Sequence, residues 1–237
     1  MKRLTKPRFI LVYPIAVALF LFGRTTEPQL RFGIFLAVVG ELVRLWANGY
    51  VGHVKVNRTE PQRGDAKIGR FVTAGPYAFV RHPLYFGTLL IGAGFCTAMG
   101  NWWLSLLAMA FFLFIYGAKM KTEEELLLHE CGERYSAYFA HVPRWVPTFR
   151  RYADPQWRWT WQGILASKEL KTVIWVTVFF VLLYFREEYL QEHELFSETA
   201  WGKHLLLTVL VAALIAGDGI FELLRKLRRQ RAVAAAA

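Results

Sequence analysis

The sequence contains only two cysteines, Cys96 and Cys131, and neither stands at a spacing typical of metal ligands. Two cysteines in 237 residues provide neither a disulfide framework nor a zinc ligand set. The apolar pattern places Cys96 near the outer end of a membrane span and Cys131 on a cytoplasmic helix, so we expect them not to meet. The sequence therefore predicts a protein without disulfide bonds or bound metal.

Two further motifs are absent. The chain has no glycine-rich strand-turn-helix of the kind that binds nucleotides in soluble enzymes, so a pocket for such a cofactor would have to lie between helices. No small-x-small cleavage site follows the basic residues that precede Phe9. We therefore interpret the first apolar run as a retained span and not as a removed secretory signal.

Hydrophobic residues are abundant, at 55 % of the chain. That share and a mean hydropathy of +0.27 exceed what soluble domains usually carry, and they indicate a membrane protein. The fold class that we predict is all-α, a polytopic membrane helix bundle of about six spans. The apolar runs are Phe9 to Gly23, Gly33 to Gly52, Leu84 to Ala98, Trp102 to Ala118, Thr172 to Phe185 and His204 to Gly217.

Basic residues lie mostly on one side of these predicted spans. With residues 1–8, 53–82, 119–171 and 218–237 on that side, it holds 24 of the 29 Lys and Arg residues. The positive-inside rule then places both termini and both long loops in the cytoplasm. The net charge of +11 is accordingly explained by topology and by attraction to anionic membrane lipids, and we expect no nucleic-acid partner.

The stretch from Gly75 to Gly87, Gly-Pro-Tyr-Ala-Phe-Val-Arg-His-Pro-Leu-Tyr-Phe-Gly, leads from a polar loop into an apolar helix. Pro83 suits the first turn of a helix and pushes His82 toward an extended conformation. Arg81 and His82 are thereby placed beside a helix N-terminus, where free N–H groups and the dipole favour an anion. This stretch predicts a binding site at the cytoplasmic end of the third span.

A second polar stretch begins at Glu123 and Glu124 and follows the fourth span without an evident break. We expect one helix through Tyr138, with Glu124, Cys131 and Tyr135 on a shared face. From Trp102 to Glu124 such a helix rises about 33 Å, roughly one hydrocarbon thickness. The two carboxylates should therefore reach the cytoplasmic interface at the level of Arg81 and His82.

These two stretches together resemble the superfamily of isoprenylcysteine carboxyl methyltransferases and phospholipid methyltransferases. The resemblance covers roughly residues 33–147 and includes Arg44-Leu-Trp46-Ala47 of the second span. Its pattern falls on Gly75 to Gly87, Glu123, Glu124, Gly132, Tyr135, Tyr138, Val142 and Pro143. Cys131 stands where we expect an aromatic residue in relatives.

The resemblance implies a cofactor, S-adenosylmethionine, with S-adenosylhomocysteine as its product, and a lipophilic or lipid methyl acceptor. Carboxylates suit the ribose diol and ammonium of this cofactor, cations its carboxylate, and aromatic residues its adenine. Arg81 is the candidate catalytic residue, because a guanidinium can hold an acceptor group by two parallel hydrogen bonds. The candidate cofactor-binding residues are Tyr77, His82, Pro83, Tyr85, Gly87, Glu123 and Glu124, and the candidate substrate-binding residues are Glu41, Arg44 and Arg144.

Other interpretations stay open at this point. Glu41 and Arg44 lie on one helical face, and a mutual ion pair that locks helix packing is as reasonable as a role in the site. A membrane reductase that uses NADPH, resembling sterol reductases, or a non-catalytic scaffold or transporter, are alternative functions. We expect one membrane domain, divided into residues 1–32, a methyltransferase-like core at 33–147, and residues 148–237 with two further spans and a basic tail. The oligomeric state and the nature of the accepting atom are left open.

Overall fold

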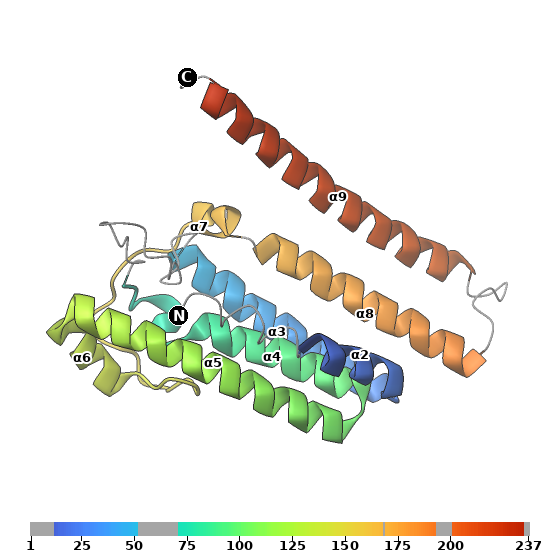
Figure 1. Cartoon of the computed structure of the whole chain (residues 1–237), viewed down its shortest axis with the longest axis horizontal. Coiled ribbons are helices and arrows are strands. Elements are labelled where there is room, and N and C mark those ends of the chain that lie inside the picture. The colour runs from blue at the N-terminus through green and yellow to red at the C-terminus, as the bar shows by residue number, and fades with distance from the viewer. Residues whose placement is uncertain (1–11, 52–70, 168, 193–200, 235–237) are drawn as a thin grey trace. The chain divides into compact units, whose positions relative to one another are not determined.

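The computed structural model describes residues 12–51, 71–167, 169–192 and 201–234 (Figure 1). Every regular element within these ranges is helical, which confirms the all-α class for the described part of the chain. The elements are α2 (Val12–Phe22), α3 (Glu27–Val51), the 3-10 helix η1 (Gly75–Ala78), α4 (Pro83–Met99), α5 (Trp102–Cys131), α6 (Glu133–His141), α7 (Trp161–Ala166), α8 (Glu169–Glu192) and α9 (Trp201–Ala234). The predicted connector at 53–74 lies outside the described residues as far as residue 70, as does the start of the predicted first span.

The chain divides into two compact units, Met1–Glu169 and Leu170–Ala237. The first unit contains α2 to α7 and both sequence motifs, and the second contains α9 and all of α8 except its first residue. Within the second unit, the ammonium of Lys171 lies 3.1 Å from the carboxylate of Asp218 and links α8 to α9. The predicted single membrane domain stays a prediction.

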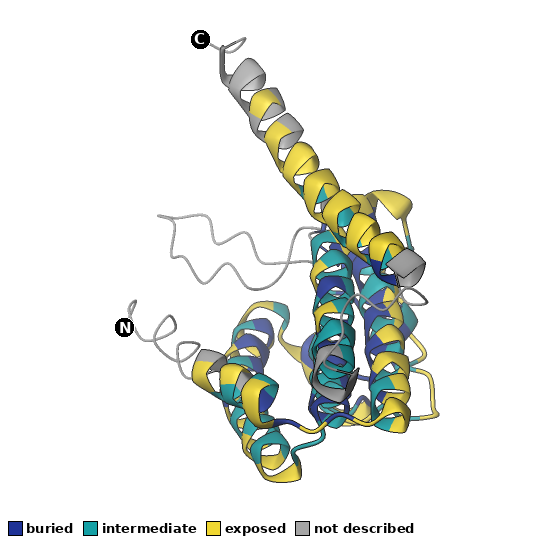
Figure 2. Cartoon of the chain, turned by 90° about the vertical axis from the view of Figure 1, so that its right-hand side faces the viewer, coloured by how far each residue is buried: buried dark blue, intermediate teal, exposed yellow. Residues whose placement is uncertain are grey.

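A helix occupies each of the six predicted apolar runs. Two of the described helical segments, α5 and the part of α9 from His204 to Leu223, are long and apolar enough to cross a membrane. Much of α9 is exposed (Figure 2), and large apolar side chains such as Trp103, Phe114 and Leu206 are open to the surroundings. This outward apolar surface is what lipid contact requires, whereas the count of six spans stays a prediction.

Glycines bring α3 and α4 into close contact. A Cβ atom on Gly40 would lie 2.6 Å from the carbonyl oxygen of Gly87, and a Cβ atom on Gly87 would lie 2.5 Å from Cγ of Arg44. Gly33 and Gly94 approach each other in the same way, 2.5 Å from a hypothetical Cβ to the facing carbonyl oxygen. Backbone-to-backbone approach of this kind is typical of membrane helix pairs.

We expect Gly40→Ala to destabilise the first unit by about 1–3 kcal/mol, because the added methyl group meets backbone and the two helices must move apart. Gly92→Ala is the matched control on α4, since nothing lies within 4 Å of its Cβ position. It should leave stability unchanged or raise it through helix propensity. Thermal unfolding in detergent compares the two, and equal midpoints would contradict the close crossing.

The turn between α4 and α5 is tight, because α4 ends at Met99 and α5 begins at Trp102. Gly100 ends α4 in the left-handed region, with φ of 65°, and the Asn101 side chain caps α5 by accepting a hydrogen bond from Leu104 N at 3.2 Å. The two helices therefore run antiparallel from this hairpin, and their other ends meet at the site.

The prediction of one unbroken helix through Tyr138 is wrong at a single residue. α5 continues past Glu123 and Glu124 but ends at Cys131, because Gly132 adopts φ of 54° and ψ of −130°, which side-chain-bearing residues rarely adopt. α6 then starts in a new direction, so Tyr135 does not extend the face of Glu124. It packs with Tyr138, Leu127 and Val142 in a small core of its own.

Candidate functional site at the ends of α4 and α5

The third predicted span begins as the sequence indicates, with Pro83 as the first residue of α4 and His82 at the N-cap. The His82 side chain makes no capping hydrogen bond. It reaches across instead to α5, where its Nε2 atom lies 3.1 Å from Oε1 of Glu124. The two motifs thus meet as predicted. The side chain of His82 contacts Glu124 and does not cap α4.

Glu124 is the buried centre of an ion cluster. Its Oε1 atom lies 3.1 Å from Nη1 of Arg81 and accepts a hydrogen bond from Nε of Arg144 at 3.1 Å, while Oε2 accepts from Nη2 of Arg144. Arg81 also stacks on the ring of Phe139, 3.9 Å from its centroid. The anion held by Arg81 and His82 is therefore the protein's own carboxylate.

Glu123 faces a different set of partners. The hydroxyl of Tyr85 on α4 donates a hydrogen bond to Oε1 of Glu123, and Oε2 lies 3.8 Å from Nδ1 of His82. Like Glu124, Glu123 is buried, but only Glu123 lines the cavity described below. The two adjacent carboxylates thus have separate environments, one saturated by cations and one turned to open space.

The segment after α6 clamps the first motif in place. Backbone hydrogen bonds run from Arg81 N to the Pro143 carbonyl at 2.9 Å and from Thr148 N to the Phe79 carbonyl at 2.9 Å. The Tyr138 hydroxyl donates to the carbonyl of Tyr77 at 2.7 Å. The Val-Pro part of the pattern is therefore explained by its contact with the loop that carries Arg81.

Burial and charge shift several pKa values outside the apolar helices. Burial raises the pKa values of the Tyr77, Tyr135 and Tyr138 hydroxyls, so all three are protonated at neutral pH. The hydrogen bond to Glu124 raises the pKa of the Arg144 guanidinium further above its usual range. Neutral tyrosines and a fixed cation therefore support the site across the physiological pH range.

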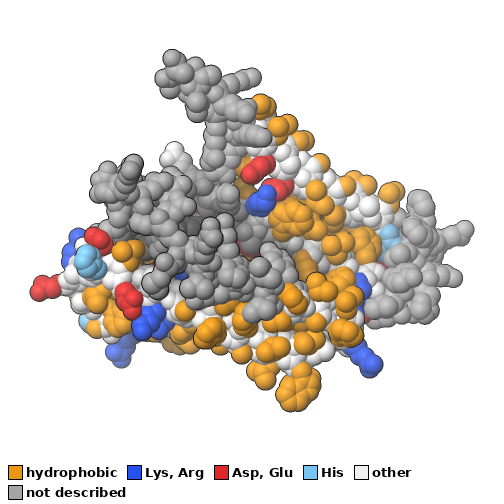
Figure 3. Space-filling model, in the orientation of Figure 1, with side chains coloured by type: hydrophobic (Ala, Val, Ile, Leu, Met, Phe, Trp, Pro, Cys, Tyr) orange, Lys and Arg blue, Asp and Glu red, His pale blue; other side chains and the backbone are white. Residues whose placement is uncertain are grey.

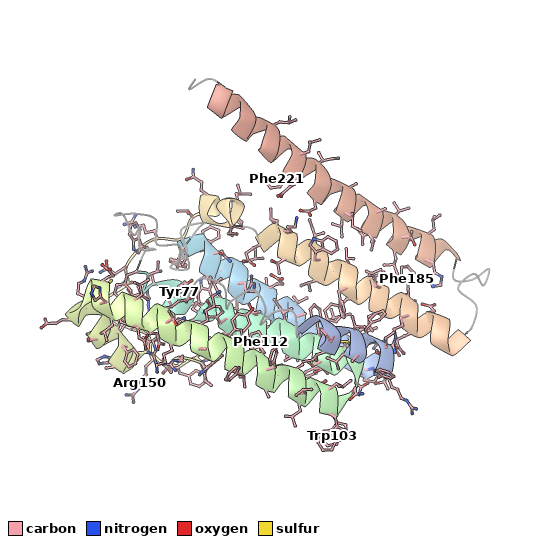
Figure 4. The ribbon with its side chains drawn as sticks, in the orientation of Figure 1. Tyr77, Trp103, Phe112, Arg150, Phe185 and Phe221 are labelled. Carbon is pink, nitrogen blue, oxygen red and sulfur yellow. The ribbon has the colours of Figure 1, made fainter. Side chains whose placement is uncertain are left out.

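A cavity of about 230 Å³ opens between η1, α3, α4, α5 and α6. Tyr77 lies at the end of the helix bundle where this cavity is found, whereas Trp103 marks the opposite end of α5 (Figure 4). Its polar and aromatic lining consists of Arg44, Phe71, Tyr77, Arg81, His82, Tyr85, Thr88, Tyr116, Lys119, Glu123, Tyr135 and Tyr138. In the same orientation, charged side chains gather at this end of the visible surface, whereas hydrophobic side chains predominate along its lower edge towards the opposite end, where a few basic side chains also appear (Figure 3).

The proposed mutual ion pair of Glu41 and Arg44 is not formed. Arg44 donates instead to both carboxylate oxygens of Glu169, at 2.9 and 2.8 Å, and also to the Thr88 hydroxyl. Neither carboxylate oxygen of the buried Glu41 has a hydrogen-bond partner among the described residues. The difference arises because Glu169 offers a bidentate partner, which suits a planar guanidinium better than a neighbour on the same helix.

The predicted site residues separate into three groups. Tyr77, Arg81, His82, Pro83, Tyr85, Glu123 and Arg44 line the cavity. Glu124 and Arg144 lie beside it in the ion cluster, and the buried Glu41 on α3 and Gly87 on α4 do not line it. Sequence reasoning missed Lys119, Tyr116 and Glu169. Lys119 and Tyr116 stand four and seven residues before Glu123, so helical periodicity could have placed them on the same face. Glu169 lies outside the region of the motif, and no sequence signal indicated it.

Residues 28–134 match the phospholipid methyltransferase family. The chain is 34 % identical over 76 residues to protein-S-isoprenylcysteine O-methyltransferase of Schizosaccharomyces pombe, which covers 32 % of each protein. It is 27 % identical over 125 residues, 49 % of this chain and 58 % of the relative, to protein-S-isoprenylcysteine O-methyltransferase B of Arabidopsis thaliana.

A third similar protein carries a different name. The chain is 30 % identical over 145 residues, 60 % of this chain and 58 % of the relative, to the cobalt-zinc-cadmium resistance protein CzcN of Cupriavidus metallidurans. The chain thus aligns with about a third to three fifths of the length of these relatives. No solved structure matches it significantly.

Proposed function

We propose that this chain, whose residues 28–134 match the phospholipid methyltransferase family and which is similar to isoprenylcysteine O-methyltransferases, is a membrane enzyme that uses S-adenosylmethionine to methylate a lipophilic acceptor. The acceptor is of the isoprenylcysteine-carboxylate or phospholipid type. The active site of the protein faces the cytoplasm, and so do both termini, in keeping with the distribution of basic residues.

One observation carries the proposal. The two halves of the sequence motif, 38 residues apart at Tyr85 and Glu123, are joined by a hydrogen bond at the edge of a cavity lined by tyrosines and charged groups. S-adenosylmethionine supplies an activated methyl group on a sulfonium sulfur. A carboxylate, cations and aromatic rings on one concave surface fit its ribose, amino-acid and adenine groups.

The residues of the chain have distinct tasks in this proposal. Glu123 accepts hydrogen bonds from the cofactor, and Tyr77 and Tyr85 provide aromatic surface. Glu124 does not line the cavity, so we assign it the positioning of Arg81 and His82. Arg81 extends from this cluster to the cavity wall and orients the acceptor. Catalysis then results largely from holding the acceptor and the cofactor's methyl group in the right geometry.

The size of the cavity bears on the alternatives. At about 230 Å³ it lies below the roughly 300–1,000 Å³ of typical ligand pockets, so it must widen around a nucleoside-sized ligand. A larger dinucleotide would require still more space, and no observation favours NADPH.

The direct test incubates the purified protein with S-adenosylmethionine carrying a labelled methyl group and a membrane lipid extract, and identifies labelled lipids by mass spectrometry. We expect Glu123→Gln to weaken S-adenosylhomocysteine binding about 5- to 150-fold, because about 1–3 kcal/mol is lost with a buried charged acceptor. Calorimetric titration measures this change.

The control is Glu133→Gln, an exposed carboxylate at the start of α6 that does not line the cavity. It should bind S-adenosylhomocysteine as the unaltered protein does. Equal affinities for the two variants would remove Glu123 from the site, and an unaltered protein that binds no adenosyl ligand would overturn the proposed function.

A further inference from the structure

Among the described residues, four with basic side chains line the cavity, and three of them are already engaged. Arg44 is bound to Glu169, Arg81 is paired with Glu124, and the His82 ring bridges toward both carboxylates of α5. The fourth is Lys119. Its ammonium has no hydrogen bond or ion pair within the described part of the chain, and lies over the Tyr85 ring at 5.3 Å from the centroid.

Lys119 stands four residues before Glu123, so the two side chains emerge from the same face of α5 one turn apart. Tyr85 joins them from α4, with its ring under the ammonium and its hydroxyl on Oε1 of Glu123. The Oε2 atom of Glu123 is 3.8 Å from the nearest His82 nitrogen, too far for a hydrogen bond. The cavity wall thus carries one positive and one negative group side by side.

The placement of Lys119 on this helix is itself informative. Lys119 is only partly exposed, and removing an ammonium group from water is costly without a partner. An ion pair with Glu123 within 4 Å is not formed, although the spacing of the residues suits it. The ammonium of Lys119 therefore lies over the Tyr85 ring at the cavity. This cation–π contact stabilises the ammonium modestly and leaves its charge available to a ligand.

We propose that Lys119 and Glu123 form the subsite for the amino-acid end of S-adenosylmethionine, with the ammonium of Lys119 on the cofactor's carboxylate and the carboxylate of Glu123 on its ammonium. An α-amino acid carries its ammonium and its carboxylate on the same α-carbon, which matches a lysine and a glutamate one helical turn apart. This inference rests on the proposed function. It assigns the cofactor's carboxylate to Lys119 and not to His82 and the N-terminus of α4, because the anion beside His82 is the side chain of Glu124.

The test compares two probes, S-adenosylhomocysteine and its decarboxylated analogue, which keeps the adenosyl and amino groups. We expect Lys119→Met to weaken binding of S-adenosylhomocysteine about 10- to 100-fold, as for loss of a charged hydrogen bond, and to leave the affinity for the decarboxylated analogue unchanged. Lys119→Arg should retain most of the affinity for both. Lys121→Met, which removes an exposed lysine of the same helix, should change neither.

The outcomes separate the inference from the proposed function. If the unaltered protein binds neither probe, the cofactor assignment itself is wrong. If it binds S-adenosylhomocysteine and Lys119→Met binds it equally well, only the subsite is wrong. An equal loss for both probes would show that Lys119 acts by holding Tyr85 in place, which also overturns the assignment of the carboxylate.

Discussion

Replacement of Glu124 by alanine is expected to destabilise the first unit by about 3–5 kcal/mol. The Glu124 side chain is only 5 % exposed, and its removal leaves the buried guanidinium of Arg81 and the partly exposed one of Arg144 without this countercharge. The chain from Tyr77 to Arg81 and the segment after α6 are held together around this carboxylate, so both should loosen. Thermal unfolding in detergent measures the effect, expected as a drop in Tm of roughly 6–20 °C.

Glu125→Ala is the matched control, one residue further along α5. Its carboxylate is exposed and lies 4.0 Å from Lys121, a surface pair whose loss should change stability by less than about 0.5 kcal/mol. If the Glu124→Ala and Glu125→Ala proteins unfold at the same temperature, the cluster contributes no net stability. The cofactor affinities of the two variants are compared at a temperature at which both proteins are folded.

A second large effect is expected at Glu169. Glu169→Ala leaves the guanidinium of Arg44 without its bidentate partner, and such a broken buried pair costs about 3–5 kcal/mol. The Glu169 side chain is 2 % exposed, so water does not replace the lost partner easily. Thermal unfolding of the single variant measures the loss.

The double variant Arg44→Met with Glu169→Leu tests the cause. Removal of both charges in favour of apolar side chains of similar volume should restore most of the lost stability, because no unpaired charge remains. A double variant as unstable as Glu169→Ala would mean that side-chain contacts, and not the uncompensated charge, explain the loss. Arg44 lines the cavity, so ligand affinity is measured separately from stability.

The fold was predictable where the residues have direct backbone consequences. Pro83 starts α4, Gly100 and Asn101 form the hairpin, and a helix lies in the described part of each apolar run. The break at Gly132 was not predicted, because a glycine inside a helical pattern is often tolerated and only the positive φ makes it a break.

The candidate site was predictable as a meeting of two motifs but not in its internal pairing. Depth along a helix can be counted from the sequence, so the encounter of His82 with Glu124 was foreseeable. The partner of a charge depends on distances across the fold, which helical periodicity does not contain. For this reason the pairing of Arg44 with Glu169, and the different surroundings of Glu123 and Glu124, emerge only from the structure.

The bond between Arg44 and Glu169 also has a consequence for the order of events during synthesis. The two residues are 125 positions apart, so at about 5–20 residues per second the ribosome needs about 6–25 s to supply the carboxylate after the arginine. During that interval α3 carries the guanidinium of Arg44 without its bidentate partner. Glu169 is the last residue of the first unit, so this ion pair forms only after the rest of the unit has been synthesised.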